Sequence, residues 1–464
     1  MAGAFFSKEI YIERRRKLSE QVGTGLVLLL GNEESSMNYK DNWYRFRQDS
    51  SFLYYAGLDL AGLALVIDID KNEEYLVGED ASIDDIIWTG PLPSIQELAH
   101  SVGINRSINY KNLQTIIGKA QESQQTIHLL PPYRPENSIK LANWLSVGLG
   151  GVEKYVSVKL IRSIVAQREI KEAIEIAEMD KANSISAEMH LEVIRNARPG
   201  MREYELVAYT EAVSNKYWGR LAYSTILTVN GQTLHNHYYG NTIQEGQMVL
   251  VDAGAEAESH YAGDLTRTFP VAKTFTTQQK EIYNIVLRSL DHATSLLKPG
   301  IQYREIHAQA SLELLKGLRD IGIVKGSPED ALAADVHTLF FQCGLGHMIG
   351  LDVHDMEDLG EQYVGYGDEL VKSKSFGWKS LRLAKTLQPG FTLTVEPGLY
   401  FIPELIDRRK AEKQFVDFVN YDLLESFKKF GGVRIEDNYV ITENAARKLG
   451  NHLPRTAEEM ESLR

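Results

Sequence analysis

The sequence predicts a two-domain protein, with an N-terminal α/β domain followed by a larger α+β domain built from two similar halves. Three observations support this fold class. The chain has 464 residues, which is more than one ordinary hydrophobic core accommodates. Short apolar runs bounded by turn residues fill the first third, and one strand motif occurs twice in the remainder. We expect the domains to span residues 1–158 and 159–464.

The N-terminal domain is expected to hold a sheet covered by helices. The runs GLVLLLG (25–31), ALVIDI (64–69) and TIHLLPP (126–132) are short and apolar, which is typical of strands in a covered sheet. Helical stretches such as SIQELAHSVG (94–103) lie between them. The glycine-containing tract 145–158 is a plausible domain boundary.

The second domain is expected to begin with one long amphipathic helix over about 161–196, which ends at a Pro-Gly stop. An internal duplication follows. ARPGMREYELVAYT (197–210) resembles LKPGIQYREIHAQA (297–310), and TIQEGQMVLVDAG (242–254) resembles TLQPGFTLTVEPG (386–398). The sequence therefore predicts two halves related by a pseudo-twofold axis.

The duplication places acidic residues at matching positions. Asp252 follows Gly246 by six residues and Glu396 follows Gly390 by six. Each half also has a second acidic strand, which carries Asp264 in the first half and Glu436 in the second. A pseudo-twofold axis would bring the four carboxylates together, and such a cluster is very costly to bury without positive charge. One or two divalent cations would supply that charge, and we expect His347 to add a nitrogen ligand.

Composition excludes some partners. The net charge of −13 disfavours binding to nucleic acid. The N-terminus lacks the apolar run of a signal peptide, and no apolar run approaches the length of a membrane span. Cys343 is the single cysteine, so no internal disulfide is possible. We expect a cytoplasmic protein that binds neither nucleic acid nor membrane.

Five blocks resemble the signature of a known family. VDAG, GDLTRTFP, GLGHMIGLDVHD, TVEPGLYF and GGVRIED look like the blocks of the pita-bread metallopeptidases, in the branch of the Xaa-Pro dipeptidases and Xaa-Pro aminopeptidases. FRQDSSFLYYAGL (46–58) resembles the first domain of that branch. The resemblance covers nearly the whole chain and implies a creatinase/aminopeptidase-like pita-bread catalytic domain after the N-terminal domain.

The resemblance implies a site with two divalent metal ions. It assigns the ligand positions to Asp252, Asp264, His347, Glu396 and Glu436, with Asp264 and Glu436 shared by both ions. Mn²⁺ is the usual metal of the family and suits an oxygen-rich ligand set, while Co²⁺, Fe²⁺ and Zn²⁺ remain open. A water activated by the two ions would then attack the scissile carbonyl.

The resemblance also implies catalytic and substrate-binding residues. Glu396 would carry the proton. His235 and His354 fall at the two positions where the family keeps substrate-side histidines, although His237 lies close to His235. His354 would stabilise the developing oxyanion. Arg382 falls where the dipeptidase branch places an arginine for the substrate's C-terminal carboxylate.

Two positions depart from the family pattern. Cys343 stands where the family usually has a histidine, four residues before His347, which puts catalytic efficiency or proline preference in question. The spacing from Asp252 to Asp264 is one residue longer than usual, and a β-bulge or looser turn would absorb it. We also expect Arg434 to pair with a carboxylate near Glu436, and Tyr223 is a candidate site residue.

Taken singly, these residues have ordinary explanations. Asp252 alone fits a turn, Glu436 alone a solvated charge, and His347 alone a structural histidine. The repeat and the five blocks together favour a metal-dependent peptidase that takes peptides with proline in the second position. The resemblance of Arg382 and of residues 398–437 to the dipeptidase branch favours an Xaa-Pro dipeptidase. The alternatives are an Xaa-Pro aminopeptidase for longer peptides and a catalytically inactive pita-bread binding protein. The resemblance further implies a homodimer or a dimer of dimers, in which the N-terminal domain serves dimerisation and access to the site.

Overall fold

The computed structural model describes residues 4–464 and divides the chain into two compact units, which meet in the sequence between Arg168 and Glu169. The first unit therefore includes ten residues beyond the expected boundary after Val158. No helix in the described part of the chain is both long enough and apolar enough to cross a membrane.

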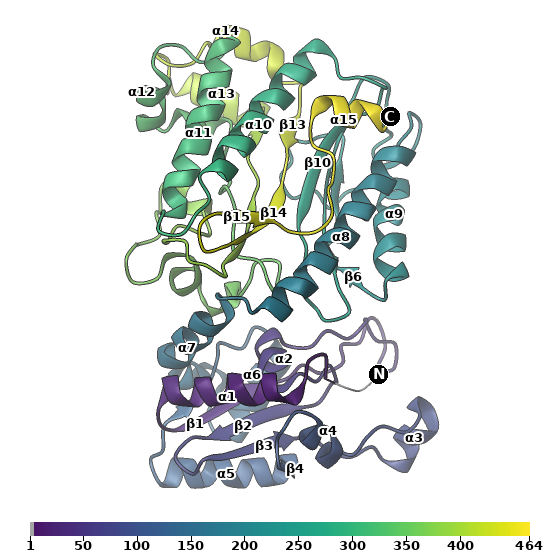
Figure 1. The fold of residues 1–464 in the computed structure, drawn as a ribbon, viewed down its shortest axis with the longest axis vertical. Helices are drawn as coiled ribbons and strands as arrows, with labels where there is room; N and C mark the ends of the chain where they lie inside the picture. Colours follow the sequence, from purple (N-terminus) through teal and green to yellow (C-terminus); the bar gives the residue numbers. More distant parts are fainter. Residues whose placement is uncertain (1–3) are drawn as a thin grey trace. The chain divides into compact units, whose positions relative to one another are not determined.

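The first unit is an α/β domain around one mixed sheet (Figure 1). The sheet order is β4-β3-β2-β1-β5; β2 is antiparallel to both β1 and β3, while β5 and β4 run parallel to β1 and β3 respectively. The three predicted apolar runs form β1, β2 and β5. The elements are α1 (Lys8–Val22), β1 (Leu26–Leu30), α2 (Ser50–Ala56), β2 (Ala64–Asp68), β3 (Glu73–Val77), α3 (Ile83–Thr89), α4 (Ile95–Ser101), β4 (Arg106–Ile108), α5 (Tyr110–Glu122), β5 (Ile127–His128), α6 (Pro135–Trp144), the 3₁₀ helix η1 (Leu149–Tyr155) and α7 (Val158–Arg168).

The prediction of one long helix over 161–196 is wrong. The helix is broken into α7, which ends at Arg168, and α8 (Ala173–Asn196). In the break, the backbone N–H of Lys171 donates to the carbonyl of Gly390, and its buried ammonium pairs with Asp355 at 2.8 Å. At the start of α8 the N–H of Glu172 donates to the carboxylate of Glu175 at 2.8 Å. Partners more than 180 residues away thus override the local helical pattern.

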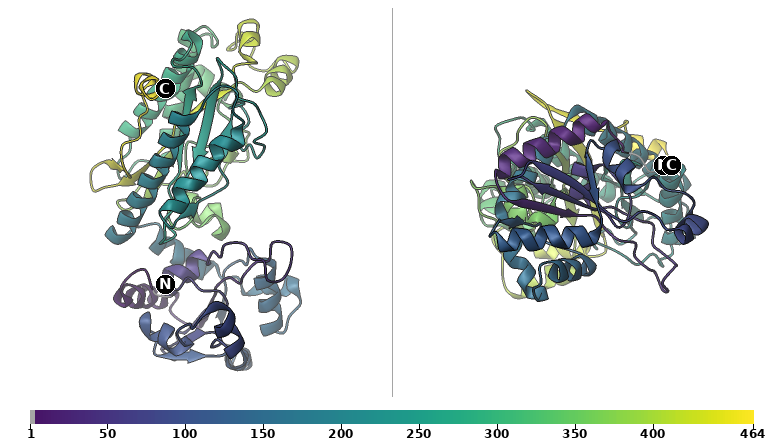
Figure 2. Two further views of the ribbon diagram at one scale, coloured as in Figure 1. Left: turned by 90° about the vertical axis from the view of Figure 1, so that its right-hand side faces the viewer. Right: turned by 90° about the horizontal axis from the view of Figure 1, so that it is seen from below.

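The second unit combines antiparallel sheets with flanking helices (Figures 1 and 2). Helix α8 packs on β8, β9 and β10, and α10 packs on β11, β12 and β13. After α8 the elements are α9 (Glu203–Lys216), β6 (Arg220–Leu221), β7 (Ile226–Thr228), β8 (Met248–Ala253), β9 (Ala255–Glu256), β10 (Leu265–Pro270), α10 (Thr277–Ser295), α11 (Tyr303–Asp320), α12 (Pro328–Ala333), η2 (Val336–Leu339), η3 (Glu357–Leu359), the π-helix η4 (Gln362–Tyr366), η5 (Trp378–Ser380), β11 (Thr392–Val395), β12 (Gly398–Tyr400), α13 (Pro403–Ala411), α14 (Tyr421–Leu424), η6 (Glu425–Phe427), β13 (Gly432–Arg434), β14 (Asp437–Ile441), β15 (Ala446–Lys448) and α15 (Ala457–Ser462).

The two halves of this unit repeat the same contacts. The N–H of Gly200 donates to the carbonyl of Ile243 at 2.8 Å, and the N–H of Gly300 donates to that of Leu387 at 2.9 Å. An isolated β-bridge joins Arg202 to Thr242 in the first half, and another joins Gln302 to Thr386 in the second. The paired positions are equivalent in the two sequence repeats, so the predicted internal duplication is present in the structure.

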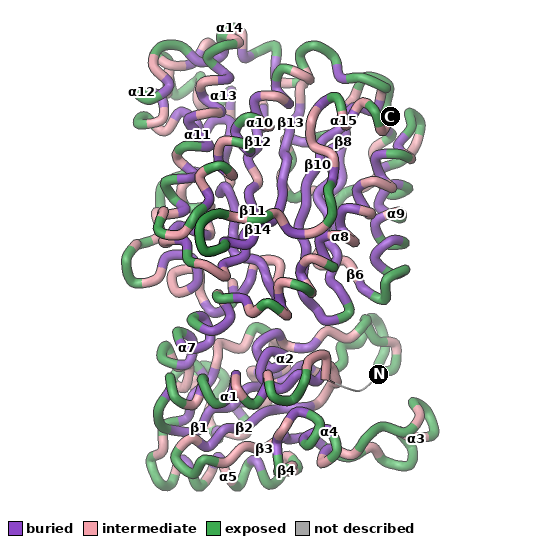
Figure 3. The backbone as a smooth tube through the Cα atoms, in the orientation of Figure 1, coloured by how far each residue is buried: buried purple, intermediate pink, exposed green. Residues whose placement is uncertain are grey.

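The turn glycines of the repeat have matching backbone conformations. Gly246 has a φ of 81° and Gly390 a φ of 88°, in the left-handed region where a side chain is strained. Each turn leads into a strand that is buried along its length, β8 in one half and β11 in the other (Figure 3). The buried strands carry the chain to the centre of the unit.

Candidate metal centre

The first half brings its two acidic residues to the end of one strand pair. Asp252 is the penultimate residue of β8, and Asp264 immediately precedes β10. The antiparallel register pairs Ala253 with Leu265, so both carboxylates lie at the same end of the ladder. Gly254 fits only without a side chain, since a Cβ there would lie 1.8 Å from the carbonyl oxygen of Gly263.

Between these strands the chain makes an excursion over residues 255–262. Strand β9 pairs with β6, and a turn closes with His260 at a φ of 69° and its N–H bonded to the carbonyl of Ala257. This is a looser turn of the kind that the longer spacing between Asp252 and Asp264 predicts.

The second half repeats the arrangement. Glu396 immediately follows β11 and Glu436 immediately precedes β14, while Val395 pairs with Asp437. The halves join at this point, because the N–H of Glu436 donates to the carbonyl of Thr266 at 3.0 Å. The pseudo-twofold packing thus gathers carboxylates from four separate stretches of sequence.

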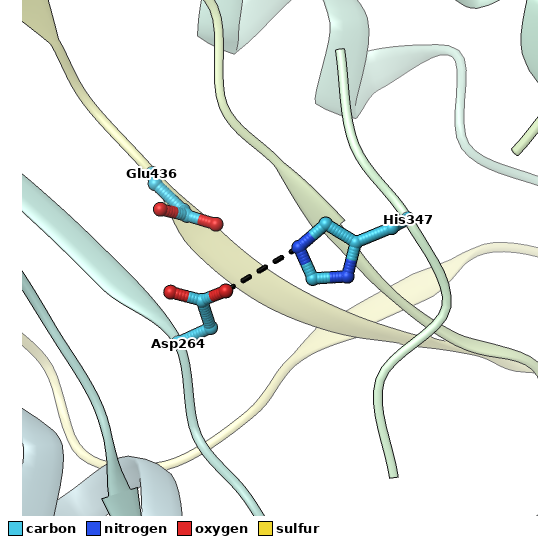
Figure 4. Close-up of side chains that lie close together, drawn as sticks. All are labelled: Asp264, His347 and Glu436. Atoms are coloured by element: carbon cyan, nitrogen blue, oxygen red, sulfur yellow. Dashed lines mark ion pairs between the residues drawn. The ribbon is translucent and has the colours of Figure 1, made fainter. Parts of the chain in front are cut away.

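His347 is held to β11 by its backbone. Its N–H donates to the Thr394 hydroxyl at 3.1 Å, and the N–H of Thr394 donates to its carbonyl at 3.0 Å. The ring donates through Nδ1 to the carbonyl of Met348 at 2.9 Å, which turns Nε2 toward the carboxylates. Nε2 lies 3.3 Å from Oδ2 of Asp264 and 3.6 Å from Oε1 of Glu396. Figure 4 shows Asp264, His347 and Glu436 pointing toward one another.

The electrostatics of the cluster call for positive charge. Burial raises the pKa of Glu436 well above its ordinary value and raises that of Glu396 to about 7. Burial also raises the pKa of Asp252. Burial disfavours the charge of His347 too, but Asp264 and Glu396 outweigh it and raise its pKa. Burying these carboxylates in their charged form therefore costs free energy, and bound cations would offset that cost.

The donor set fits divalent cations. One ligand atom each from Asp264, His347 and Glu436 lies within 4.8 Å of the others. Oε1 of Glu436 is buried and has no hydrogen-bond partner among residues 4–464. An unpartnered carboxylate oxygen beside three other carboxylates is a ready ligand position, and an oxygen-rich set with one imidazole suits hard or borderline divalent metals.

A second layer of polar groups orients these carboxylates. The Tyr223 hydroxyl lies within hydrogen-bond distance of both Asp252 and Asp264, which share its single proton. The guanidinium of Arg434 pairs with Asp252 and donates to the Tyr400 hydroxyl at 2.9 Å. The expected pairing of Arg434 with a carboxylate is thus present, and its partner is Asp252. Thr266 links Arg434 to Glu436, since its hydroxyl accepts from Nε of Arg434 at 3.2 Å and donates to Oε2 of Glu436 at 2.7 Å.

All eight residues proposed from the sequence line one cavity of about 770 Å³. Besides the five candidate ligands, its walls include His235, His354 and Arg382. This volume lies within the range of small-molecule sites.

The two substrate-side histidines differ in how firmly they are held. The ring of His354 packs edge-on against that of His347, with centroids 4.3 Å apart, and its Nδ1 bonds Glu357. Burial and the charge of His347 lower the pKa of His354. His235 is exposed on an irregular segment, and His237 lines the same cavity. Their positions alone therefore do not decide which of the two is the substrate-side histidine.

Arg382 lies in the cavity wall with acidic neighbours. Its Nε is 3.3 Å from Glu357 and 3.7 Å from Glu361. Glu361 also pairs with Lys372, a further residue of the wall. Sequence reasoning missed Glu357, Glu361 and Tyr400. The fragment LDVHDMED does carry a signal for the first, since a carboxylate three residues after His354 is within reach of its ring.

Cys343 also lines the cavity. Its sulfur lies 3.8 Å from the Tyr400 hydroxyl, and burial together with the charge of Glu396 raises the pKa of the thiol to about 12. Cys343 is therefore a neutral wall residue near neutral pH, and a water nucleophile remains the chemistry that fits the site.

Comparison with known proteins agrees with this geometry. Residues 177–443 match metallopeptidase family M24, and residues 11–129 match the aminopeptidase P N-terminal domain. The chain is 32% identical over 460 residues to the Xaa-Pro dipeptidase of Homo sapiens, covering 97% of this chain and 90% of that protein. It is 31% identical over 465 residues to the probable Xaa-Pro aminopeptidase of Uncinocarpus reesii, covering 96% and 91%.

Solved structures show the same fold. Zinc-substituted aminopeptidase P from E. coli, in complex with product, superposes with a TM-score of 0.80 at 28% identity, covering 99% of this chain and 98% of that one. Proline aminopeptidase P II from Yersinia pestis gives a TM-score of 0.80 at 27% identity, covering 99% of both chains. The resemblance and the pita-bread fold predicted from five short blocks are therefore confirmed, and the chain belongs to metallopeptidase family M24 with an aminopeptidase P-type N-terminal domain.

Proposed function

We propose that this metallopeptidase hydrolyses the peptide bond before proline and acts chiefly on Xaa-Pro dipeptides. The observation that carries the proposal is the convergence of four carboxylates and one imidazole, from both halves of the repeat, in a single cavity. Similarity over nearly the full length to proteins named Xaa-Pro dipeptidase supplies the substrate class.

The proposed cofactor is a pair of divalent cations, with Mn²⁺ favoured by the oxygen-rich donor set. Asp252, Asp264, His347, Glu396 and Glu436 would hold the pair, with Asp264 and Glu436 contributing to both ions. When bound, such a pair lowers the pKa of a water molecule and polarises a carbonyl oxygen.

The remaining groups position and move protons. Glu396 is proposed to carry the proton from the nucleophilic water to the leaving nitrogen, since its carboxyl faces the cavity at the centre of the cluster. With Nδ1 donating to Glu357, which would keep the ring oriented, His354 would have to be protonated on both ring nitrogens in the substrate complex to donate through Nε2 to the carbonyl oxygen as negative charge develops there. His235, which lines the same cavity, would contact the substrate, with His237 as the competing assignment.

Arg382 is proposed to select a free C-terminus. Its ion pairs within residues 4–464 use Nε, so the two terminal nitrogens can still donate to a carboxylate. An Xaa-Pro aminopeptidase for longer peptides remains the second candidate, because proteins with that name are similar over the same length of this chain. A homodimer, a cytoplasmic location and the opposing idea of an inactive binding protein stay predictions from the sequence.

The direct test is to strip the protein of metal, reload it with Mn²⁺, Co²⁺, Fe²⁺ or Zn²⁺, and assay Ala-Pro, Ala-Pro-Ala and Ala-Ala. We expect about two ions per chain by metal analysis, and turnover of Ala-Pro above Ala-Pro-Ala with little of Ala-Ala. Preferential turnover of Ala-Pro-Ala would favour the aminopeptidase. No turnover with any metal would favour the inactive binding protein.

A further inference from the structure

We infer that Lys379 is a second specificity residue, which binds the free C-terminal carboxylate of the peptide substrate together with Arg382; this inference rests on the proposed function. Its basis is the charge balance of one wall of the cavity. The segment that follows π-helix η4 contributes three cations to that wall, namely Lys372, Lys379 and Arg382.

Two of the three cations already have acidic partners. Lys372 pairs with Glu361, and Arg382 lies within ion-pair distance of Glu357 and Glu361. Burial, followed by the charge of Arg382, lowers the pKa of Lys372. Two carboxylates therefore face three cations.

Lys379 is the cation without a counter-charge. Within residues 4–464 no carboxylate lies within ion-pair distance of its ammonium, which is exposed on a side chain that lines the cavity. The deeper cation of the cavity, Arg434, is neutralised by Asp252. A cation without a carboxylate partner thus lines the cavity, and a peptide with a free C-terminus brings a carboxylate to it.

The backbone around Lys379 is fixed although its side chain is free. Lys379 belongs to the 3₁₀ turn η5, whose Trp378 donates through Nε1 to Asp335 at 2.7 Å. The N–H of Lys379 donates to the carbonyl of Ser375 at 2.8 Å. The turn also packs on Gly344, three residues before the candidate ligand His347, where an added Cβ would lie 2.8 Å from the Ser380 carbonyl oxygen. A fixed turn against the ligand-bearing segment is a suitable base for a selecting charge.

The test compares peptide substrates that have a free C-terminal carboxylate with the same peptides amidated at the C-terminus. Michaelis constants are measured for Ala-Pro, Ala-Pro-Ala and their C-terminal amides, with the manganese-loaded wild type, Lys379→Gln, Lys379→Arg and the control Lys374→Gln. Lys374 lies in the same segment and is exposed, but it does not line the cavity. We expect Lys379→Gln to raise KM for the free acid about tenfold with kcat nearly unchanged, to leave the amides unaffected, and to be rescued by Lys379→Arg.

The outcomes separate clearly. If Lys379→Gln raises KM for Ala-Pro and not for its amide, Lys379 binds the C-terminus of a dipeptide. If it does so for Ala-Pro-Ala, Lys379 binds a C-terminus that lies one residue further from the cleaved bond. Equal losses on acid and amide, or an unchanged KM for both free acids, would overturn the inference. If the wild type hydrolyses none of these peptides, the proposed function fails by itself. Calorimetry would then measure how tightly Ala-Pro and its amide bind. The role of Lys379 requires that Lys379→Gln weaken the binding of Ala-Pro and leave that of the amide unchanged.

Discussion

Two pairs of histidines in the second unit have the same angle between their rings, at centroid separations of 4.3 and 6.1 Å, and very different surroundings. His347 and His354 at the candidate metal centre meet edge to face at 72°, and so do His307 of α11 and His337 of η2. The first pair lies among carboxylates. The second pair is buried among Phe341 and Trp378, whose ring centroids lie 5.5 and 5.0 Å from that of His307.

The contrast shows that neighbouring groups, rather than burial, decide what a histidine does. Burial lowers the pKa of His307 to about 3 and that of His337 to about 4, because no carboxylate offsets the loss of water strongly enough. Neither nitrogen of His337 has a partner among residues 4–464. His347 is as deeply buried, yet Asp264 and Glu396 raise its pKa. The first environment suits a ligand, and the second a neutral packing group.

Removing a carboxylate from the metal centre should have the largest effect. We expect Asp264→Asn to lower kcat about 1000-fold or more and to reduce the bound manganese, since this residue bonds Tyr223 and faces His347. Steady-state kinetics and metal analysis would check both. Asp330→Asn, at an exposed position of α12, is the matched control. Full activity of Asp264→Asn with two ions bound would remove Asp264 from the ligand set.

The next effect should come from the groups that orient the ligands. Tyr223→Phe removes the hydroxyl that Asp252 and Asp264 share, and we expect manganese affinity to fall about 10- to 100-fold. Isothermal titration of metal-free protein would measure it. The exposed Tyr204→Phe is the control. If both variants bind manganese like the wild type, the hydroxyl has no part in orienting the two carboxylates.

Acid should sharpen the difference between the pairs. In the unfolded chain a histidine takes a proton near pH 6.5, whereas His307 and His337 in the folded protein resist protonation until about pH 3 and 4. Between these values the unfolded state binds more protons, so the stability that these residues contribute is complete above pH 6.5 and falls as the pH drops toward 4. In urea unfolding at pH 7, 6 and 5, the free energy of unfolding should therefore fall less with decreasing pH for His337→Leu than for the wild type. Parallel curves would contradict the assignment.

The smallest effect is expected at neutral pH. His337→Leu replaces a neutral buried ring by an apolar side chain of similar size, so the free energy of unfolding should change by no more than about 1.5 kcal/mol. The activity and manganese content of His337→Leu should match those of the wild type, because His307 and His337 have no part in metal binding. A loss of metal on this substitution would end the distinction between the two pairs.

Local patterns were sufficient to predict much of the site. The strands that carry Asp252 and Glu396 are short repeats with a turn glycine at a fixed distance, so their convergence could be inferred from the duplication. The acidic neighbours of Arg382 could not be predicted from the sequence, because they depend on how the segment after η4 folds back onto the cavity. The break between α7 and α8 was missed for the same reason, since the buried pair of Lys171 and Asp355 joins positions far apart in the sequence.

Gly254 and Gly263 let the two ends of the loop between Asp252 and Asp264 approach each other closely. The pairing of Ala253 with Leu265 fixes the register of Asp252 and Asp264, and the close backbone approach at Gly254 pins the hairpin below that pair. Residues 255–262 are buried except for Glu258, and the Tyr261 hydroxyl donates to Glu175 at 2.7 Å. A change in the length of this loop would therefore disturb packed side chains, and an insertion should be tolerated best at the exposed Glu258.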